Sequence, residues 1–462
     1  MLPTPIADFI DNYIASGAAR FHMPGHKGRL LPECAYDITE FDGAGDLFAE
    51  DGIVAESEAV ASSLFGCRTF YSTEGSSLAI RAMLALATGS GNKTVLAGRN
   101  AHRAYLSAAI LLGLETEWLC PAENASYLSC PLTAQQVKRA LDRRAEPPAA
   151  VYLTSPDYLG HTLDVAAIAA VCHQKGVPLL VDNAHGAYLK FLPASRHPID
   201  LGADLCADSA HKTLPALTGG AYLHLSDDAA RRWAGEVKET MALFATASPS
   251  YLLLRSLDLT NRYLAIYPEK LRAFLCTTDA LKKRLTASGF VLEGDEPLKL
   301  TLSARPRGCT GTELAQQLYQ NNIIPEFYDP DFVTCMLTPE NTDAELLALE
   351  RALKRLPQRP PLTTDRPAFH LPERVMSPRE AFFSPKETVP VENSVGRICA
   401  SAAVACPPAI PIAVCGERID KTAAALLRYY GIGRLAVVRE AAFFPSAVPK
   451  NGPKQSNSTK KN

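Results

Sequence analysis

The chain has 462 residues, which is long for one hydrophobic core and suggests about three structural units. Its 47 Lys and Arg against 49 Asp and Glu give a net charge of −2, so no electrostatic field gathers nucleic acid or anionic lipid. The composition also excludes collagen-like, coiled-coil and wholly disordered chains. We therefore expect an enzyme or a large binding protein, with neither nucleic acid nor a membrane as its partner.

The cysteines and the first residues indicate where the protein works. Twelve cysteines are scattered from Cys34 to Cys415 without a CxxC pair, which predicts neither a metal site nor a disulfide framework. The start carries Asp8 and Asp11 and lacks the basic-then-apolar run of a signal peptide. No stretch approaches the roughly 18 uninterrupted apolar residues of a membrane span. We expect reduced thiols and a cytoplasmic protein.

The first half of the chain alternates apolar runs with amphipathic stretches. Residues 94–97, 149–154 and 177–182 are typical of buried parallel strands, and residues 164–173 repeat apolar positions at helical spacing. Asp164 is placed to cap this helix and Gly176 to end it. A further strand is predicted over 219–225. The pattern indicates an α/β fold with helices on both faces of a mostly parallel sheet.

The second half has a different pattern. Residues 230–285 are predicted to be helical, 299–302 a strand and 312–318 a helix, which fits a smaller α+β domain. Prolines crowd residues 357–390, as in a linker or an extended arm, and the Ser-, Asn- and Lys-rich end is typical of disorder. The expected units are an N-terminal segment 1–20, a large domain 21–260, a small domain 261–356, a linker with a C-terminal domain 357–440, and a disordered tail 441–462.

A lysine follows one of the expected strands. The strand is expected to end near Cys206, and Lys212 lies in the turn after it, at the edge where α/β sheets hold their ligands. A lone lysine in a loop is usually a solvated surface charge. Here Ser209 and Thr213 add hydroxyl donors and His211 adds an imidazole, so the segment is a candidate site.

Asp182 ends another strand of the same predicted sheet. A carboxylate at the end of an apolar strand needs a cation, and a protonated pyridine nitrogen is one. Pyridoxal phosphate enzymes pair an aspartate on the ring nitrogen with a lysine in Schiff base to the aldehyde. The alternative is that Asp182 caps a helix or braces His185.

Two further segments add to this edge. Gly75, Ser76 and Ser77 open a helical run and offer backbone N–H groups and hydroxyls to a phosphate, although a plain helix cap is the simpler interpretation. His102 follows the 94–97 strand and is placed to lie on a flat ligand. The Walker and dinucleotide fingerprints are absent. The four segments together indicate a phosphate-bearing aromatic cofactor more specifically than any one alone.

These segments resemble the ornithine/lysine/arginine decarboxylases, pyridoxal phosphate enzymes of the aspartate-aminotransferase-like fold (fold type I), in their short form. The resemblance is close over about residues 20–260 and looser at 406–411 and 416–417. The matching segments are residues 21–28 (FHMPGHKG), 99–103 (RNAHR), 154–160 (TSPDYLG), 181–186 (VDNAHG), 209–215 (SAHKTLP) and 248–251 (SPSY). The resemblance implies a large domain with a mostly parallel seven-stranded sheet and smaller α+β C-terminal domains.

The resemblance also implies roles for single residues. Lys212 would be the Schiff-base lysine, Asp182 the partner of the pyridine nitrogen, and His211 a catalytic group on the substrate side. The remaining implied cofactor contacts are Ser76, Ser77 and Ser209 on the phosphate, His102 on the ring, and His185. Thr246 would reach the phosphate of a neighbouring subunit, which implies a homodimer or higher homo-oligomer with shared sites. Glu417 would lie near the far end of the substrate.

The implied reaction is decarboxylation of arginine, lysine or ornithine to its amine, through a Schiff base and a quinonoid intermediate, as in polyamine biosynthesis. The alternatives are an aminotransferase or β-eliminating lyase of the same fold, and a catalytically silent regulatory partner. Three residues depart from the family pattern: Glu74 replaces an asparagine beside the phosphate loop, and Ala409 and Cys415 replace a glycine and a proline. These departures concern substrate choice more than cofactor binding.

Overall fold

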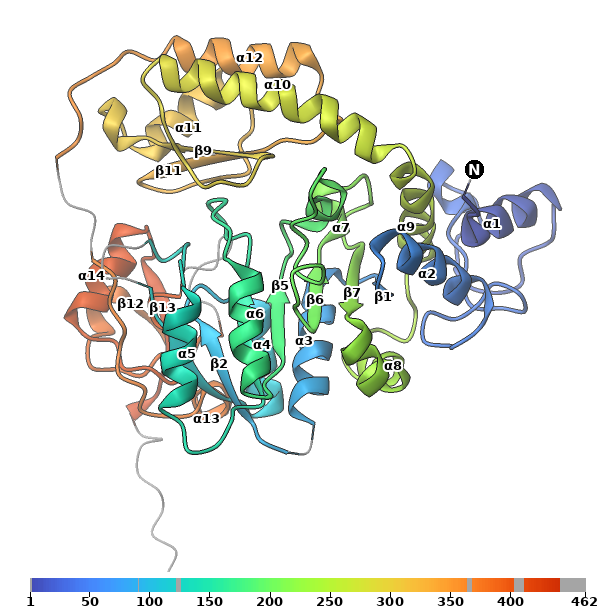
Figure 1. The fold of residues 1–462 in the computed structure, drawn as a ribbon, viewed down its shortest axis with the longest axis horizontal. Helices are drawn as coiled ribbons and strands as arrows, with labels where there is room; N and C mark the ends of the chain where they lie inside the picture. Colours follow the sequence, from blue (N-terminus) through green and yellow to red (C-terminus); the bar gives the residue numbers. More distant parts are fainter. Residues whose placement is uncertain (1, 90, 122–125, 364–367, 403–410, 441–462) are drawn as a thin grey trace, which may run out of the picture.

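A seven-stranded sheet forms the centre of the protein (Figure 1). The computed structural model describes residues 2–89, 91–121, 126–363, 368–402 and 411–440. The strand order is β1-β7-β6-β5-β4-β2-β3, and β7 runs antiparallel to both of its neighbours while the other strands are parallel. The strands are β1 Arg68–Ser72, β2 Thr94–Gly98, β3 Glu115–Leu119, β4 Ala150–Thr154, β5 Leu179–Asp182, β6 Leu205–Asp208 and β7 Ala221–Leu225.

Helices cover both faces of this sheet. Apolar side chains of α5 and α6 pack on one face, and those of α3, α4 and α8 pack on the other. The helices of this part are α2 Gly52–Phe65, α3 Gly75–Thr88, α4 Arg103–Leu112, α5 Ala134–Asp142, α6 Val165–Gln174, α7 Ala210–Thr213 and α8 Asp227–Ala242. The predicted α/β class with a mostly parallel seven-stranded sheet is confirmed.

The predicted βαβ unit is β4-α6-β5. The Asp164 carboxylate accepts a hydrogen bond from the amide of Ala167 at 3.0 Å and so caps α6. Gly176 follows the helix with φ +65°, a left-handed conformation that glycine adopts without steric cost. Both end signals are confirmed, and β5 begins two residues later than predicted.

A smaller unit follows the large sheet. It has a four-stranded antiparallel sheet of order β10-β11-β9-β8, and Figure 1 shows it facing the carboxyl ends of the large sheet's parallel strands. Its elements, with the helices leading into it, are α9 Tyr251–Leu264, α10 Tyr267–Ala287, β8 Val291–Glu293, β9 Lys299–Ser303, α11 Gly311–Gln320, β10 Phe327–Tyr328, β11 Phe332–Met336 and α12 Asp343–Lys354. The predicted strand 299–302 and helix 312–318 lie within β9 and α11.

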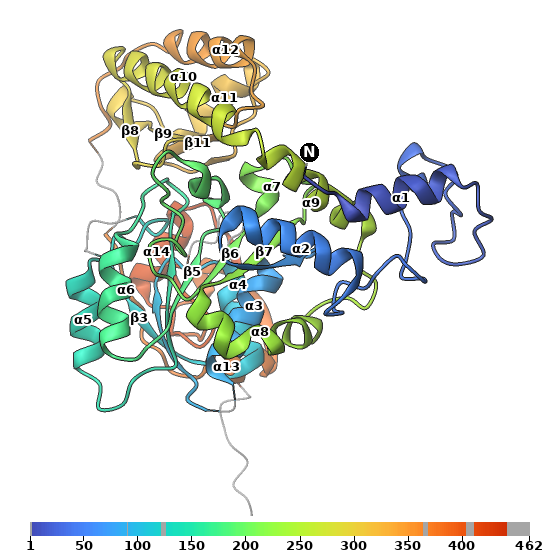
Figure 2. The same cartoon turned by 45° about the vertical axis from the view of Figure 1, so that its right-hand side comes forward.

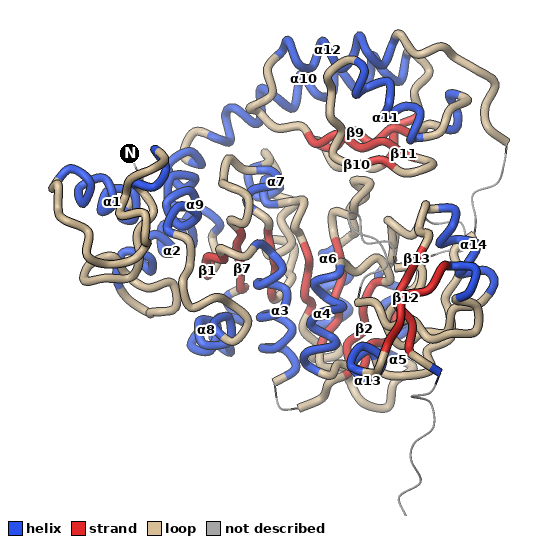
Figure 3. Tube along the Cα trace, turned by 180° about the vertical axis from the view of Figure 1, so that it is seen from behind, coloured by secondary structure: helices blue, strands red, loops and turns tan. Residues whose placement is uncertain are grey.

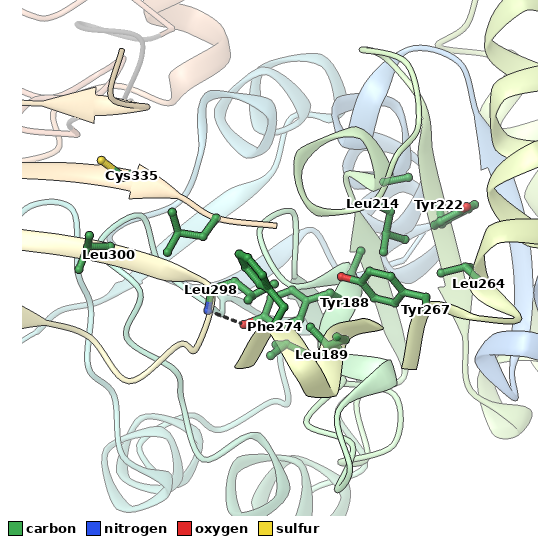
Figure 4. Close-up of a cluster of buried hydrophobic side chains, with 14 of the residues drawn as sticks. Tyr188, Leu189, Leu214, Tyr222, Leu264, Tyr267, Phe274, Leu298, Leu300 and Cys335 are labelled. Atoms are coloured by element: carbon green, nitrogen blue, oxygen red, sulfur yellow. Dashed lines mark hydrogen bonds between the residues drawn. The ribbon is translucent and has the colours of Figure 1, made fainter. Parts of the chain in front are cut away.

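The two sheets share one apolar core. Buried side chains run from the segment after β5 through α10 to β9, and Figure 4 shows Phe274 and Tyr188 beside Leu298, with Tyr267 next to Tyr188. The amide of Leu298 donates to the Tyr188 hydroxyl at 3.5 Å. This continuous core fixes the small sheet above the large one.

The last described residues pack beside the β2–β3 end of the large sheet. Figure 3 shows the β12–β13 pair there, and Ala381, Ile398 and Val438 pack against Ile110 of α4. The elements are α13 Pro378–Phe383, β12 Lys386–Pro390, α14 Lys421–Tyr429 and β13 Arg434–Val438. The proline-rich stretch is therefore partly structured, because α13 and β12 lie in it. Ala409 and the tail 441–462 lie outside the described residues.

The N-terminal helix α1, Pro5–Ala15, packs on α2 and α9. The chain after it projects from the body (Figure 2). Two apolar side chains of this segment, Phe21 and Leu30, are exposed. Among the helices of the described segments, none combines the length and the hydrophobicity that crossing a lipid bilayer requires.

Candidate active site

A cavity of about 240 Å³ lies at the carboxyl ends of β2, β4 and β5. One wall residue, Glu326, comes from the small unit and precedes β10, so the cavity lies between the two sheets. The lining residues are Ser76, Asn100, His102, Leu128, Thr154, Tyr158, Asp182, Ala184, His185, Lys212 and Glu326. Five of the predicted site residues are thus brought together: Ser76, His102, Asp182, His185 and Lys212.

Lys212 enters the cavity from α7, the short helix that follows β6. The strand ends at Asp208 rather than near Cys206, and the lysine lies in a single helical turn rather than in an open turn. Its Nζ lies 3.1 Å from Nε2 of His185. The amine therefore lies within hydrogen-bond distance of an imidazole nitrogen.

Asp182 is close to Lys212 because their strands are neighbours. Asp182 pairs with Ala207 across β5 and β6, so the residues after both strands emerge at one edge. The Tyr152 hydroxyl donates to Oδ2 at 3.1 Å, and the Ala184 amide donates to Oδ1 at 3.1 Å. Burial raises the pKa of the Asp182 carboxyl, and the positive charge of Lys212 opposes that shift.

The histidines around Lys212 favour the neutral form. Burial, followed by the charges of Lys212 and Arg103, lowers the pKa of His102 to about 4. Burial and the charge of Lys212 hold the pKa of His185 well below its ordinary value. The pKa of His211 is also lowered by burial, although its Nδ1 lies 2.9 Å from the Gly220 carbonyl oxygen. His211 does not line the cavity.

Helix α3 begins at the cavity with the predicted phosphate-binding sequence. Ser76 lines the wall, and the buried Ser209 hydroxyl donates to the Ser76 hydroxyl at 2.8 Å. Ser77 does not line the cavity. Free N–H groups of a helix's first turn attract anions, so the two bonded serines and this helix end form a site of the right character for a phosphate.

Glu74, the departure beside this loop, has a specific partner. Its Oε1 accepts a hydrogen bond from the amide of Thr246 at 2.6 Å. The carboxylate thus ties the chain that precedes α9 to the start of α3. Thr246 is exposed and does not line the cavity of its own chain, so its predicted role toward a second subunit stays a prediction.

A second buried carboxylate, Asp208, lies on the neighbouring strand. Nε2 of His197 and Nε2 of His224 lie 3.0 and 3.2 Å from its Oδ2, and the Asn183 amide donates to its Oδ1 at 2.7 Å. Burial would raise the pKa of Asp208, but the two imidazoles outweigh burial and lower it. The three side chains could offer a ligand atom each to a metal ion, yet here they bond to one another.

Several residues of the cavity wall were not predicted from the sequence. Asn100 and Thr154 belong to segments that matched the family, but neither was assigned a role. The Tyr158 hydroxyl donates to Oε1 of Glu326 at 3.2 Å, which joins two parts of the chain 168 residues apart. Glu326 reaches the cavity only because the small unit docks on the large sheet. The one feature of the sequence that could have indicated Glu326 was its charge, which directly precedes the apolar start of a strand.

Glu417 lies elsewhere than predicted. Arg99 Nη1 and Nη2 donate to its two carboxylate oxygens at 2.6 and 2.8 Å, and both side chains are almost completely buried. The guanidinium also lies 4.8 Å from the centre of the Trp118 ring. Glu417 does not line the cavity that contains Lys212. This position differs from the predicted one near the far end of the substrate. Cys415 is buried, and its thiol donates to the Pro378 carbonyl at 3.3 Å.

The residues present fit the cofactor that the sequence suggested. Nδ1 of His185 is buried in the wall without a hydrogen-bond partner among the described residues, which a polar ligand would supply. An amine, a buried carboxylate, an imidazole and a serine-lined helix end face one cavity. This donor set matches the aldehyde, ring nitrogen, aromatic face and phosphate of pyridoxal phosphate.

The chain is similar in sequence and in fold to amino acid decarboxylases. The chain is 30% identical over 457 residues to arginine decarboxylase of Bacillus subtilis, covering 90% of this chain and 91% of that protein. It is 30% identical over 464 residues to arginine decarboxylase of Halalkalibacterium halodurans, covering 92% and 93%. The solved constitutive lysine decarboxylase of E. coli shares the fold, with a TM-score of 0.75 at 17% identity over 95% of this chain and 82% of that one.

Two family models match separate parts of the chain. The Orn/Lys/Arg decarboxylase major domain matches residues 4–289, and the C-terminal domain of the same family matches residues 363–438. The first match alone covers more than half of the chain. The chain therefore belongs to the Orn/Lys/Arg decarboxylase family of enzymes.

Proposed function

We propose that this enzyme uses pyridoxal phosphate to decarboxylate a basic amino acid, with arginine as the first substrate to test. The observation that carries the proposal is the single cavity shared by the Lys212 amine and the Asp182 carboxylate. The name shared by the two similar bacterial relatives favours arginine over lysine and ornithine.

Each part of the cofactor has a candidate partner in the wall. Lys212 would hold the aldehyde carbon covalently, Asp182 would face the ring nitrogen, and His102 would lie on the ring. Ser76 and Ser209 with the start of α3 would hold the phosphate, with Ser77 and the partner subunit's Thr246 as further contacts. When bound, the cofactor supplies an electron sink for the pair left by carbon dioxide.

The side chains around Lys212 would move and hold the protons. Nε2 of His185 lies 3.1 Å from Nζ of Lys212, so the imidazole and the lysine can share a hydrogen bond. Burial and the charge of Lys212 hold the pKa of His185 well below its ordinary value, so His185 stays neutral and orients the lysine without taking its proton. His211 is bonded to Gly220, which leaves Lys212 as the better placed donor to the substrate's α-carbon.

Glu326 would bind the far end of the substrate. Of the described residues that line the cavity, Asp182 and Glu326 carry carboxylates, and Asp182 is assigned to the cofactor. Glu326 is exposed at the cavity, where a guanidinium or ammonium group can reach it. This assignment replaces Glu417, whose carboxylate is bonded to Arg99.

The test is an assay of the purified protein with pyridoxal phosphate. We expect carbon dioxide and a diamine or agmatine from one of arginine, lysine and ornithine, and no product from Lys212→Ala. Lys175→Ala, at an exposed lysine of the same domain, should retain full activity. A keto acid product would instead identify an aminotransferase, and no product from any amino acid would contradict the proposal.

A further inference from the structure

We infer that Tyr158 is a positioning residue that holds the Glu326 carboxylate at the cavity and thereby selects amino acids with a cationic side chain. The inference rests on the proposed function and deepens it. It concerns a tyrosine in the loop after β4 and a glutamate just before β10, which meet only because the small sheet docks on the large one.

The contact lies in the wall of the cavity. Both side chains line it, and the Tyr158 hydroxyl donates to Oε1 of Glu326 at 3.2 Å. A glutamate in an exposed position has many side-chain conformations, and one hydrogen bond from a fixed donor restricts them. Oε2 of Glu326 then remains to accept from a ligand in the cavity.

Three residues contact the ring of Tyr158 and hold it in place. His185 and Phe327 meet its ring edge-on, with centroids 5.0 and 5.2 Å away. The Lys299 ammonium lies 5.8 Å from the ring centre. Because His185 comes from the large sheet and the other two from the small unit, the position of the tyrosine depends on both.

The nearby lysine is bound to the same loop rather than to the glutamate. Lys299 is buried, and its Nζ donates to the main-chain carbonyl of Asp157 at 2.9 Å. Its contact anchors the residue before Tyr158. The tyrosine therefore presents its hydroxyl from an anchored loop, which is what a positioning residue requires.

The consequence is discrimination by charge. A substrate guanidinium or ammonium that reaches Glu326 would meet a carboxylate already oriented toward it. An uncharged amino acid of the same length would leave that carboxylate without a counter-charge. Removing the tyrosine hydroxyl should therefore weaken the binding of cationic amino acids and change the binding of neutral ones little.

The experiment compares Tyr158→Phe with the wild-type holoenzyme, using arginine and its uncharged isostere citrulline. We expect KM for arginine to rise about threefold to tenfold with kcat nearly unchanged, because the loss concerns substrate binding. Citrulline bound as a competitive inhibitor should show little change. If lysine or ornithine is the substrate, norleucine or norvaline replaces citrulline. Tyr328→Phe, at an exposed tyrosine two residues from Glu326, is the matched control and should behave as wild type.

A double variant separates positioning from a general structural effect. If Tyr158 acts through Glu326, then adding Tyr158→Phe to Glu326→Gln should change KM much less than it does in the wild type. The same factor in both backgrounds, or an unchanged KM in Tyr158→Phe, would overturn the inference. The affinity of these variants for arginine can also be measured by calorimetry in a Lys212→Ala background, where no turnover occurs. This comparison tests the role of Tyr158 even if the wild type is inactive, and an inactive wild type would contradict only the proposed function.

Discussion

Asp182 and the histidines near Lys212 show how burial sets charge at the level of single residues. The Asp182 carboxylate is 2% exposed, and burial raises its pKa, whereas the same burial keeps His102 and His185 neutral. A carboxylate in such a place gains from a cation, and a flat ring with a protonated nitrogen would meet that need. Neutral imidazoles can lie on such a ring without repelling its charge.

The lowered pKa of His102 has a consequence for stability. The unfolded chain protonates this histidine below pH about 6.5, while the folded, cofactor-free protein resists protonation until pH about 4. The unfolded state therefore binds more protons between these values, and the free energy of unfolding falls as the pH is lowered through this window.

His102→Asn tests this consequence. Asparagine also caps a helix but does not titrate, so it should preserve the start of α4, where Nδ1 of His102 accepts from Ala104. Urea unfolding of the cofactor-free protein measures this effect. Between pH 7 and pH 5, the free energy of unfolding of the wild type should fall by about 1 to 2 kcal/mol more than that of the variant. An equal loss in both proteins would show that His102 does not titrate as described.

At the level of elements, the ends of β5 and β6 bring Asp182 and Lys212 together. This part of the site could be predicted, because parallel strands place their carboxyl ends at one edge and both strand ends were expected near these residues, at Asp182 and Cys206. Glu326 could not be predicted, since its place depends on how the small sheet docks. The pairing of Glu417 with Arg99 could not be predicted either, because it depends on how the C-terminal residues pack against the end of β2.

The Arg99–Glu417 pair should contribute to stability rather than to substrate binding. Glu417→Gln leaves the buried guanidinium without its counter-charge, so we expect the free energy of unfolding to fall by about 3 to 5 kcal/mol. Glu373→Gln, in an exposed pair with Arg418 at 3.3 Å, should cost less than about 1 kcal/mol.

Denaturant titration measures both variants, and steady-state kinetics completes the comparison. KM for the amino acid should be unchanged in Glu417→Gln wherever the variant remains folded. A raised KM with normal stability would return Glu417 to the substrate site and contradict the role given to Glu326.

At the level of the whole molecule, the large sheet supplies the groups proposed to hold the cofactor, and the small unit supplies Glu326. The family resemblance predicts a further contact from a second subunit, through Thr246. This residue is exposed and is joined to α3 by Glu74, so the loop that carries it is fixed near the amino-terminal end of that helix in its own chain. The homodimer with shared sites stays a prediction.

Subunit mixing tests that proposal. Lys212→Ala and Thr246→Val are each expected to be inactive at limiting pyridoxal phosphate. If Thr246 serves the partner's site, a hybrid dimer has one site with both residues intact, so each hybrid dimer in the mixture should have up to half of the activity of a wild-type dimer. If each subunit uses its own Thr246, the mixture stays inactive.

The covalent link proposed at Lys212 can be tested directly. The protein is incubated with pyridoxal phosphate, reduced with borohydride, digested, and its peptides are identified by mass spectrometry. We expect one phosphopyridoxyl group, on Lys212, and none in Asp182→Ala at cofactor concentrations that saturate the wild type. Reduction that labels a different lysine, or labels none, would contradict the account.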